Sequence, residues 1–123
     1  MAYPTGSGSE RIKTNYFADF DHSADKKLID GVDLHIYTIL SVVFFNSSST
    51  ATGINMYIYP SASGSNITYL LNGTATVVPP WSSFVWNDKF SITGTDELVC
   101  AASSGGGGDM DAWITYIDQN WED

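Results

Sequence analysis

Apolar and polar residues alternate along most of the chain between residues 33 and 118, in short runs that Gly, Ser, Asn and Pro interrupt. The alternation has a period of about two residues rather than the roughly 3.6 of an amphipathic helix, so it predicts β-strands. The clearest run covers residues 34–45, which are rich in Ile, Val, Tyr and Phe and end at the polar stretch 46–49. Branched and aromatic side chains pack well on a pleated surface, and we expect a long strand there.

Shorter runs of the same kind follow, and each ends at residues that favour turns. They predict strands over residues 54–59, 66–71, 74–78, 82–86, 90–93, 97–102 and 112–118. Asn72-Gly73 predicts a type I′ turn, because both central positions of that turn need positive φ, so the strands on either side of it should pair. The strands 90–93 and 97–102 should likewise pair across the turn between them.

About eight strands at spacings of roughly 8 to 12 residues predict an all-β fold, either an antiparallel β-sandwich or jelly roll or a small barrel. We favour the sandwich or jelly roll. Residues 1–10 are rich in Gly and Ser, which predicts an extended N-terminal arm. The mixed pattern over residues 11–30 indicates irregular chain with at most one strand. The predicted organisation is an arm and irregular segment over residues 1–30 and a β-sandwich domain over residues 31–123.

The composition suits one folded domain whose surface is mostly uncharged. Of the 123 residues, 43% are hydrophobic and 15% are charged, which is too apolar for a disordered chain. Five basic residues stand against fourteen acidic ones, for a net charge of −9, and Lys89 is the only basic residue after Lys27. Such a body repels phosphate backbones, so we expect no direct binding of nucleic acid.

Three features bear on where the protein is found. The longest apolar stretch, residues 39–45, is much shorter than the roughly 20 residues that span a bilayer, so no membrane association is expected. Residues 1–10 lack the apolar segment of a signal peptide, which predicts synthesis in a reducing cytoplasm. Cys100 is the only cysteine, and its place in the apolar run 98–102 predicts a buried structural thiol.

No motif predicts catalysis, and we expect no catalytic residue and no cofactor. His22 lies in a polar segment and His35 within a predicted strand, so the two histidines do not suggest an acid–base pair. None of the serines lies in a Gly-x-Ser-x-Gly motif. Glycines 105–108 lack the Lys-Ser/Thr that follows the glycines of a phosphate-binding loop.

Acidic residues gather near two predicted turns and at the end of the sequence. They are Asp96, Glu97, Asp109, Asp111, Asp118, Glu122 and Asp123. Carboxylates in loops bind Ca²⁺, and a calcium site that joins the turns near residues 96 and 109 is one interpretation. The spacing matches neither an EF-hand loop nor a glycine-rich calcium repeat. We favour solvated charges that keep sheet edges from pairing, and we predict no metal site.

The four Trp and seven Tyr residues decide what kind of surface the protein presents. Three uses fit them: filling the core between two sheets, anchoring contacts between subunits, and stacking on sugars. The residues that we single out as surface aromatic contacts are Tyr57, Tyr59, Trp81 and Trp86.

The middle and C-terminal parts resemble a known group of proteins. The stretches that carry the likeness are Tyr37–Val43 leading into Asn46-Ser47-Ser48, then Met56-Tyr57-Ile58, Val77–Ser83 with its Pro79-Pro80-Trp81, Phe90–Leu98, and the last strand. Over about residues 33–118 the sequence resembles the small β-sandwich virion proteins of tailed bacteriophages, which include head decoration (cement) proteins and tail-associated modules. The resemblance implies a virion structural subunit, often trimeric, with an N-terminal arm that reaches its neighbours and with no shared catalytic residues.

We therefore expect a non-enzymatic capsid decoration protein that binds the assembled head and stabilises it. Its expected partners are the major capsid protein or other virion subunits, and we expect a homo-oligomer, with a trimer favoured. Its expected location is the virion, after synthesis in the host cytoplasm. The residues of the arm region expected to contact the partner are Tyr3, Arg11, Lys13, Tyr16, Phe17, Lys26 and Lys27. The alternatives are a carbohydrate-binding or tail-fibre module that contacts the host surface, and a calcium-dependent accessory domain of an enzyme.

Overall fold

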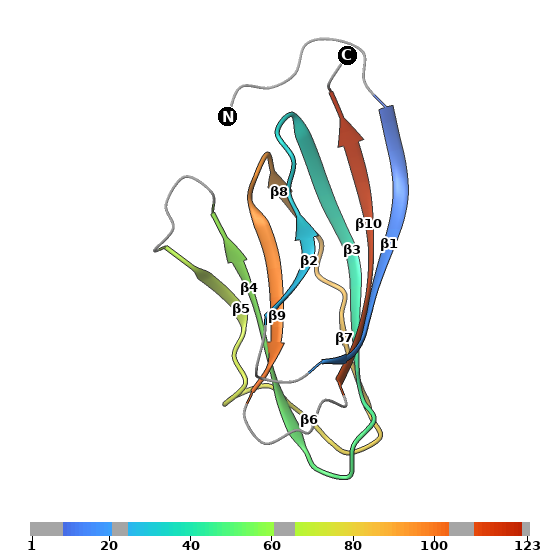
Figure 1. The fold of residues 1–123 in the computed structure, drawn as a ribbon, viewed down its shortest axis with the longest axis vertical. Helices are drawn as coiled ribbons and strands as arrows, with labels where there is room; N and C mark the ends of the chain where they lie inside the picture. Colours follow the sequence, from blue (N-terminus) through green and yellow to red (C-terminus); the bar gives the residue numbers. More distant parts are fainter. Residues whose placement is uncertain (1–8, 21–24, 61–65, 104–109, 122–123) are drawn as a thin grey trace.

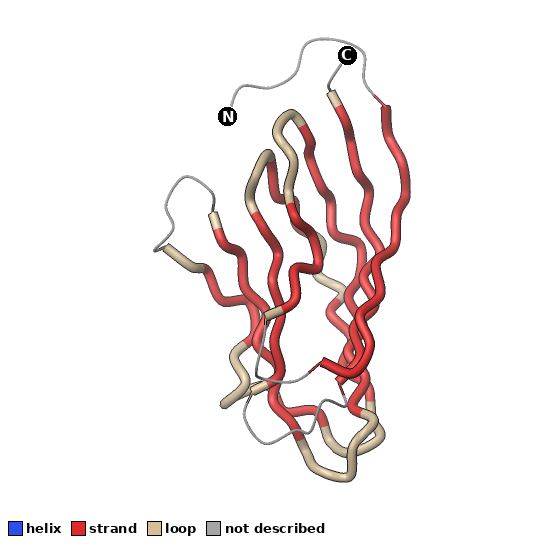
Figure 2. Tube along the Cα trace, viewed as in Figure 1, coloured by secondary structure: helices blue, strands red, loops and turns tan. Residues whose placement is uncertain are grey.

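The computed structural model describes residues 9–20, 25–60, 66–103 and 110–121, and these residues form β-strands joined by turns and loops (Figure 2). The strands are β1 (Ser9–Phe20), β2 (Lys26–Asp30), β3 (His35–Asn46), β4 (Thr52–Tyr59), β5 (Thr68–Leu71), β6 (Val77–Val78), β7 (Ser83–Trp86), β8 (Phe90–Thr93), β9 (Glu97–Ala102) and β10 (Met110–Asn120). The described part of the chain holds no helix that could cross a membrane.

Two antiparallel sheets face each other (Figure 1). The first has the order β1-β10-β3, and β7 and β8 pair with two successive parts of β3. The second has the order β2-β9-β4, and β5 and β6 pair with two successive parts of β4. The chain therefore crosses repeatedly from one sheet to the other, which is the connectivity of a jelly roll. The predicted all-β sandwich is confirmed.

The core lies between the inward faces of the two sheets. On β10, buried Ala112 and Ile114 alternate with exposed Trp113, so every second side chain of this strand points inward. Side chains from both sheets fill the space, and the largest fully buried ones are Phe20, Phe44, Leu28, Ile39, Ile54, Met56, Leu98, Met110 and Ile114. Cys100 is also fully buried here, as the sequence predicts.

The first difference from the sequence prediction concerns residues 11–30. They hold most of β1 and all of β2, one in each sheet, rather than irregular chain with at most one strand. β1 lacks a simple apolar alternation because it is an edge strand near the polar end of the core, where Arg11 and Lys13 point inward. Its pairing with β10, from Ser9 opposite Asn120 to Phe20 opposite Met110, holds it in place. Residues 1–8 of the predicted arm lie outside the described residues.

The second difference concerns the predicted hairpin at Asn72-Gly73. β5 and β6 do not pair with each other, because each pairs with a different part of β4. Gly73 has no positive φ, and its N–H donates to Oδ1 of Asn55 at 2.7 Å. A Cβ on Gly73 would collide with the side chain of Ser103. Glycine is therefore needed here because the backbone passes close to Ser103, and not because the chain forms a type I′ turn.

The third difference concerns the predicted pair of strands 90–93 and 97–102. Both strands form, as β8 and β9, but β8 pairs with β3 whereas β9 pairs with β2 and β4. The turn that contains Gly94, with φ of +60°, thus carries the chain from one sheet to the other. Short turns can join strands of different sheets as well as hairpin partners, and only long-range packing separates the two cases.

Candidate functional site

The outward face of the first sheet carries a line of apolar side chains. Tyr16, Trp113, Val43 and Val85 lie opposite one another in register on β1, β10, β3 and β7, and we call this line the outer row. Tyr16 is 53% exposed, and Trp113 and Val85 are each 49% exposed. The rings of Tyr16 and Trp113 lie 5.5 Å apart in a tilted arrangement. The outer row crosses four strands and remains open to solvent.

A second apolar pair lies on the same face. Ile12 of β1 stands opposite Ile117 of β10, and Ile12 is 71% exposed. Thr14 and Thr115 separate this pair from the outer row. Exposed apolar side chains that gather on one face commonly mark a contact with another molecule.

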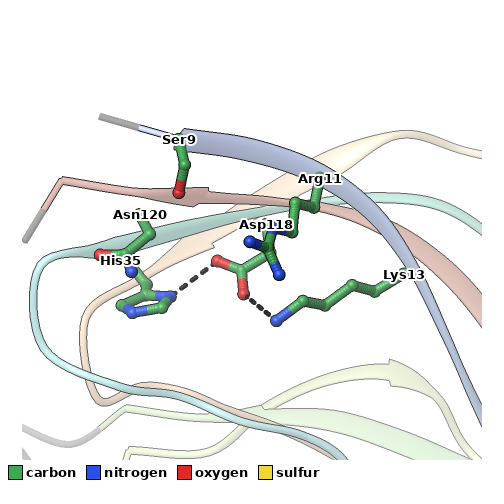
Figure 3. A pocket seen from close by; sticks show the side chains of 6 residues that line it. All are labelled: Ser9, Arg11, Lys13, His35, Asp118 and Asn120. Atoms are coloured by element: carbon green, nitrogen blue, oxygen red, sulfur yellow. Dashed lines mark hydrogen bonds and ion pairs between the residues drawn. The ribbon is translucent and has the colours of Figure 1, made fainter. Parts of the chain in front are cut away.

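The inward face of the same sheet changes from apolar to polar toward one end. Opposed residues on β1, β10 and β3 form successive inward lines, with Lys13 beside Tyr116, Arg11 beside Asp118, and finally Ser9 beside Asn120 and His35. A hollow of about 150 Å³ opens at this end (Figure 3). Its lining residues are Ser9, Arg11, Lys13, His35, Asp118 and Asn120, and we call it the polar hollow.

A wider hollow of about 300 Å³ adjoins the polar hollow. It lies between the two sheets, because residues of β2, such as Lys27 and Ile29, line it together with residues of β1, β3 and β10. Lys13, His35 and Asp118 belong to both hollows. The sandwich is therefore open at this end, and Asp118 lies at the boundary between its apolar and polar parts.

Asp118 joins three neighbouring strands through its carboxylate. Its Oδ2 accepts a hydrogen bond from Nζ of Lys13 at 2.8 Å, and its Oδ1 lies 2.7 Å from Nδ1 of His35 (Figure 3). Burial disfavours ionisation of Asp118, but the hydrogen bonds and charges of Lys13 and His35 outweigh this effect, so the pKa of Asp118 is lowered. Asp118 is thus an ionised group that ties β10 to β1 and β3.

The placement of Asp118 corrects the interpretation of the acidic residues as solvated charges. Asp118 is only 5% exposed and occupies an inward position. The sequence contains a signal for this, because Asp118 follows Ala112, Ile114 and Tyr116 at every second position and continues their buried face. Its partners are not visible in the sequence, since Lys13 is 105 residues away.

The remaining acidic residues do not form a metal site within the described residues, which hold no group of three or more His, Cys, Asp or Glu side chains suited to a metal ion. Glu97 is engaged by Nζ of Lys27 at 2.8 Å. Asp109, which the calcium interpretation requires, lies outside the described residues, as do Glu122 and Asp123. His22 lies outside them too.

The polar hollow brings together a serine, a histidine and an aspartate, which are the residue types of a catalytic triad. Hydrogen bonds join His35 to Asp118 and Asp118 to Lys13, but none joins Ser9 to His35 (Figure 3). An activated serine needs a base within hydrogen-bond reach of its hydroxyl. With Lys13 and His35 both bonded to Asp118, the arrangement suits a structural ion-pair centre.

The four predicted surface aromatics do not form one platform. Trp81 is 64% exposed and has φ of 56°, in the left-handed region that residues other than glycine rarely adopt.

The other three aromatic side chains are partly or fully covered. Tyr57 is buried, donates a hydrogen bond to Asp25 and lies beside Tyr69. Tyr59 is half-buried in β4 of the other sheet. Trp86 is half-buried against Phe90, and its Nε1 donates to the carbonyl oxygen of Asp88 at 2.7 Å. Among these four, Trp81 alone presents an open ring.

The predicted partner-binding residues of the arm region fall on different surfaces. Arg11 and Lys13 line the polar hollow, whereas Tyr16 belongs to the outer row. Phe17 is half-buried and packs against the core. Lys26 and Lys27 lie on β2, where Lys27 pairs with Glu97, and Tyr3 lies outside the described residues. The sequence suggested no role for Trp113, although its outward position in β10 follows from the strand period.

Neither family models nor curated proteins match this sequence. Solved structures do match its fold. A chain of the T13 particle of infectious bursal disease virus aligns with 94% of this chain at 13% identity, with a TM-score of 0.52. A chain of the disulfide-linked pili that form Bacillus endospore appendages aligns with 98% of this chain and 93% of its own length, at 12% identity and a TM-score of 0.49. The virus-like particle of the Macrobrachium rosenbergii extra small virus gives 98% coverage of this chain, 9% identity and a TM-score of 0.37.

The likeness to the bursal disease virus chain shows a shared fold. This chain covers only 32% of that viral chain, so it corresponds to about a third of it. This likeness does not point to tailed bacteriophages specifically.

Proposed function

We propose that this chain is a non-enzymatic structural subunit of a virion, and more specifically a decoration protein on the assembled head of a tailed bacteriophage. The observation that carries the proposal is the outer row on a jelly-roll sheet. The fold is shared with a chain of a viral particle, and the phage assignment comes from the sequence resemblance over about residues 33–118.

The outer row suits contact with another protein subunit. It places two aromatic rings, Tyr16 and Trp113, on a rigid sheet, and such rings supply large contact areas at low cost in conformational entropy. Apolar burial contributes roughly 25 cal/mol per Å², so a half-exposed Trp and Tyr contribute measurably when a partner covers them. Val43 and Val85 extend the contact across the sheet.

The mechanism would be additive over many copies. A subunit that binds only the assembled lattice stabilises that lattice by mass action. Closed symmetry, such as that of a trimer, would cover the outer rows of neighbouring copies and link several lattice contacts in one unit. Linked contacts make release slow.

The test uses the full chain and purified virus particles. The particles are those encoded by the genes that lie next to the gene for this chain. Trp113→Ser is expected to lower occupancy on purified particles, measured by co-sedimentation, and to reduce self-association, measured by light scattering. Trp81→Ser is the matched control, because Trp81 is also exposed but lies outside the outer row. Unchanged occupancy and self-association for Trp113→Ser would refute the proposal.

Trp81 favours a second candidate, a carbohydrate-binding module that contacts a host surface. Its ring is open and stands on a turn after Pro79-Pro80, so a sugar face has access to it. Binding on a glycan array that Trp81→Ala abolishes would support this candidate. Absence of glycan binding by the unmodified chain would exclude it for the glycans on the array.

A further inference from the structure

We propose that the polar hollow is a binding site for a carboxylate, supplied by an Asp or Glu side chain of a protein partner and held by the guanidinium of Arg11. The site is distinct from the outer row, because the two lie on opposite faces of the first sheet. The identification of the partner as a protein rests on the proposed function.

The first argument is the balance of charge in the polar hollow. Among the described residues that line it, Arg11 and Lys13 carry a positive charge and Asp118 a negative one, and the Asp118 carboxylate is engaged on both oxygens by Lys13 and His35. No ion pair among the described residues involves Arg11, although it stands directly opposite Asp118 in register. Among the described residues, the Arg11 guanidinium is therefore left without an ion-pair partner at the polar hollow, on a chain whose net charge is −9.

The second argument is the supply of hydrogen-bond donors. Arginine presents a planar fork that binds a carboxylate through two parallel hydrogen bonds. The hydroxyl of Ser9 lines the same hollow, at the position next to Arg11 on the inward face. These donors favour an anion as the ligand. A cation would be repelled by the positive charges of Arg11 and Lys13.

The third argument is access. Arg11 is exposed, and β1 is an edge strand that pairs with β10 alone among the described strands. A partner segment that approaches this edge places its side chains about 5 Å from those of β1. An acidic side chain on such a segment can reach Arg11 without any change in the fold. The net charge of −9 disfavours the binding of a polyanion to this chain. We therefore propose a single side-chain carboxylate as the ligand.

The test is an NMR titration of the ¹⁵N-labelled full chain at pH 7 and constant ionic strength. Acetate is expected to shift the Arg11 and Asn120 signals in a saturable way. Arg11→Gln is expected to weaken acetate binding roughly tenfold, because a charged hydrogen-bonded pair is lost. Lys89→Gln is the matched control, since Lys89 is an exposed base outside the hollow, and its effect should stay within about twofold. Absent saturation, or equal weakening by both variants, would overturn the site.

The source of the carboxylate is tested with two blocked tripeptides, Val-Asp-Val and Val-Asn-Val. Tighter binding of the Asp peptide supports a side-chain carboxylate, whereas equal binding overturns it. Inorganic phosphate that binds more tightly than the Asp peptide would contradict the choice of carboxylate. Arg11→Gln leaves the outer row intact, so loss of acetate binding with normal particle occupancy separates this inference from the proposed function.

Discussion

Lys13 and Asp118 form an ion pair of 2.8 Å although 105 residues separate them in sequence. The pair links β1 to β10, and His35 extends it to β3. These interactions therefore connect three strands of one sheet at the open end of the sandwich, where the apolar core borders the polar hollow. We expect this ion-pair centre to contribute to the stability of the fold.

Asp118→Asn should lower the free energy of unfolding by about 1–3 kcal/mol, because the side chain keeps its shape but loses its charge beside Lys13 and His35. Lys13 is 43% exposed and can turn to water, which keeps the loss below that of a fully buried pair. Urea unfolding followed by Trp fluorescence measures the change. Asp88→Asn, on an exposed side chain, is the control and should stay within about 0.5 kcal/mol. Equal effects of both variants would contradict the prediction.

The contribution of Asp118 should depend on pH in the acid range. Its folded-state pKa lies below the ordinary value of 3.8, so the folded state binds this proton less readily than the unfolded state. The stabilisation is therefore fully present above the ordinary pKa and is lost as pH falls through the lower folded-state pKa. The difference in unfolding free energy between the unmodified chain and Asp118→Asn should shrink below a pH of about 4. A difference that stays constant to pH 2 would count against this assignment.

Gly31→Ala should destabilise the fold by about 1–3 kcal/mol or more, because the new Cβ would meet the backbone carbonyl oxygens of Asp96 and Gly94. Gly94→Ala is a matched comparison, since a Cβ there meets nothing within 4 Å and only the positive φ of 60° is strained. That strain costs about 1 kcal/mol. Thermal unfolding ranks the two variants, and a larger loss for Gly94→Ala would show that the segment around Gly31 can move aside.

Trp81→Asn should raise the free energy of unfolding by roughly 0.5–1 kcal/mol, because Asn tolerates the left-handed backbone that Trp81 adopts at φ of 56°. The ring is 64% exposed, so little packing is lost. Val77→Asn, which changes a 49% exposed residue in a strand, should not stabilise. Chemical unfolding of both variants provides the measurement. A stability loss for Trp81→Asn would mean that the ring makes a contact worth more than the strain.

Cys100 should resist thiol reagents while the protein is folded. Burial, together with the charge of Asp25, raises the pKa of the Cys100 thiol to about 12, so the reactive thiolate is scarce at pH 8. Labelling with Ellman's reagent should be negligible in buffer and complete in strong denaturant. Rapid labelling of the folded chain would show that β9 opens locally.

The strand positions could be read from the sequence because alternation is a local property. The run 34–45 appears as β3 (His35–Asn46), and the run 112–118 lies within β10 (Met110–Asn120). β1 was missed because its inward positions include Arg11 and Lys13, which interrupt the apolar period. The predicted hairpins at Asn72-Gly73 and at Gly94 failed because turn residues show where the chain bends but not which strand lies beside it.

The candidate surfaces were accessible to sequence reasoning only in part. Arg11, Lys13 and Tyr16 were among the predicted contact residues. The sequence did not show that Arg11 and Lys13 point inward whereas Tyr16 points outward. Trp113 joins Tyr16, Val43 and Val85 only because β1, β10, β3 and β7 pair in one register. The sequence by itself determined an all-β chain with an inward face and an outward face on each strand, since side-chain direction follows from the period of two. Tertiary structure alone decided which strands are neighbours, because pairings between residues as distant as 13 and 118 depend on the packing of the whole chain and leave no local pattern.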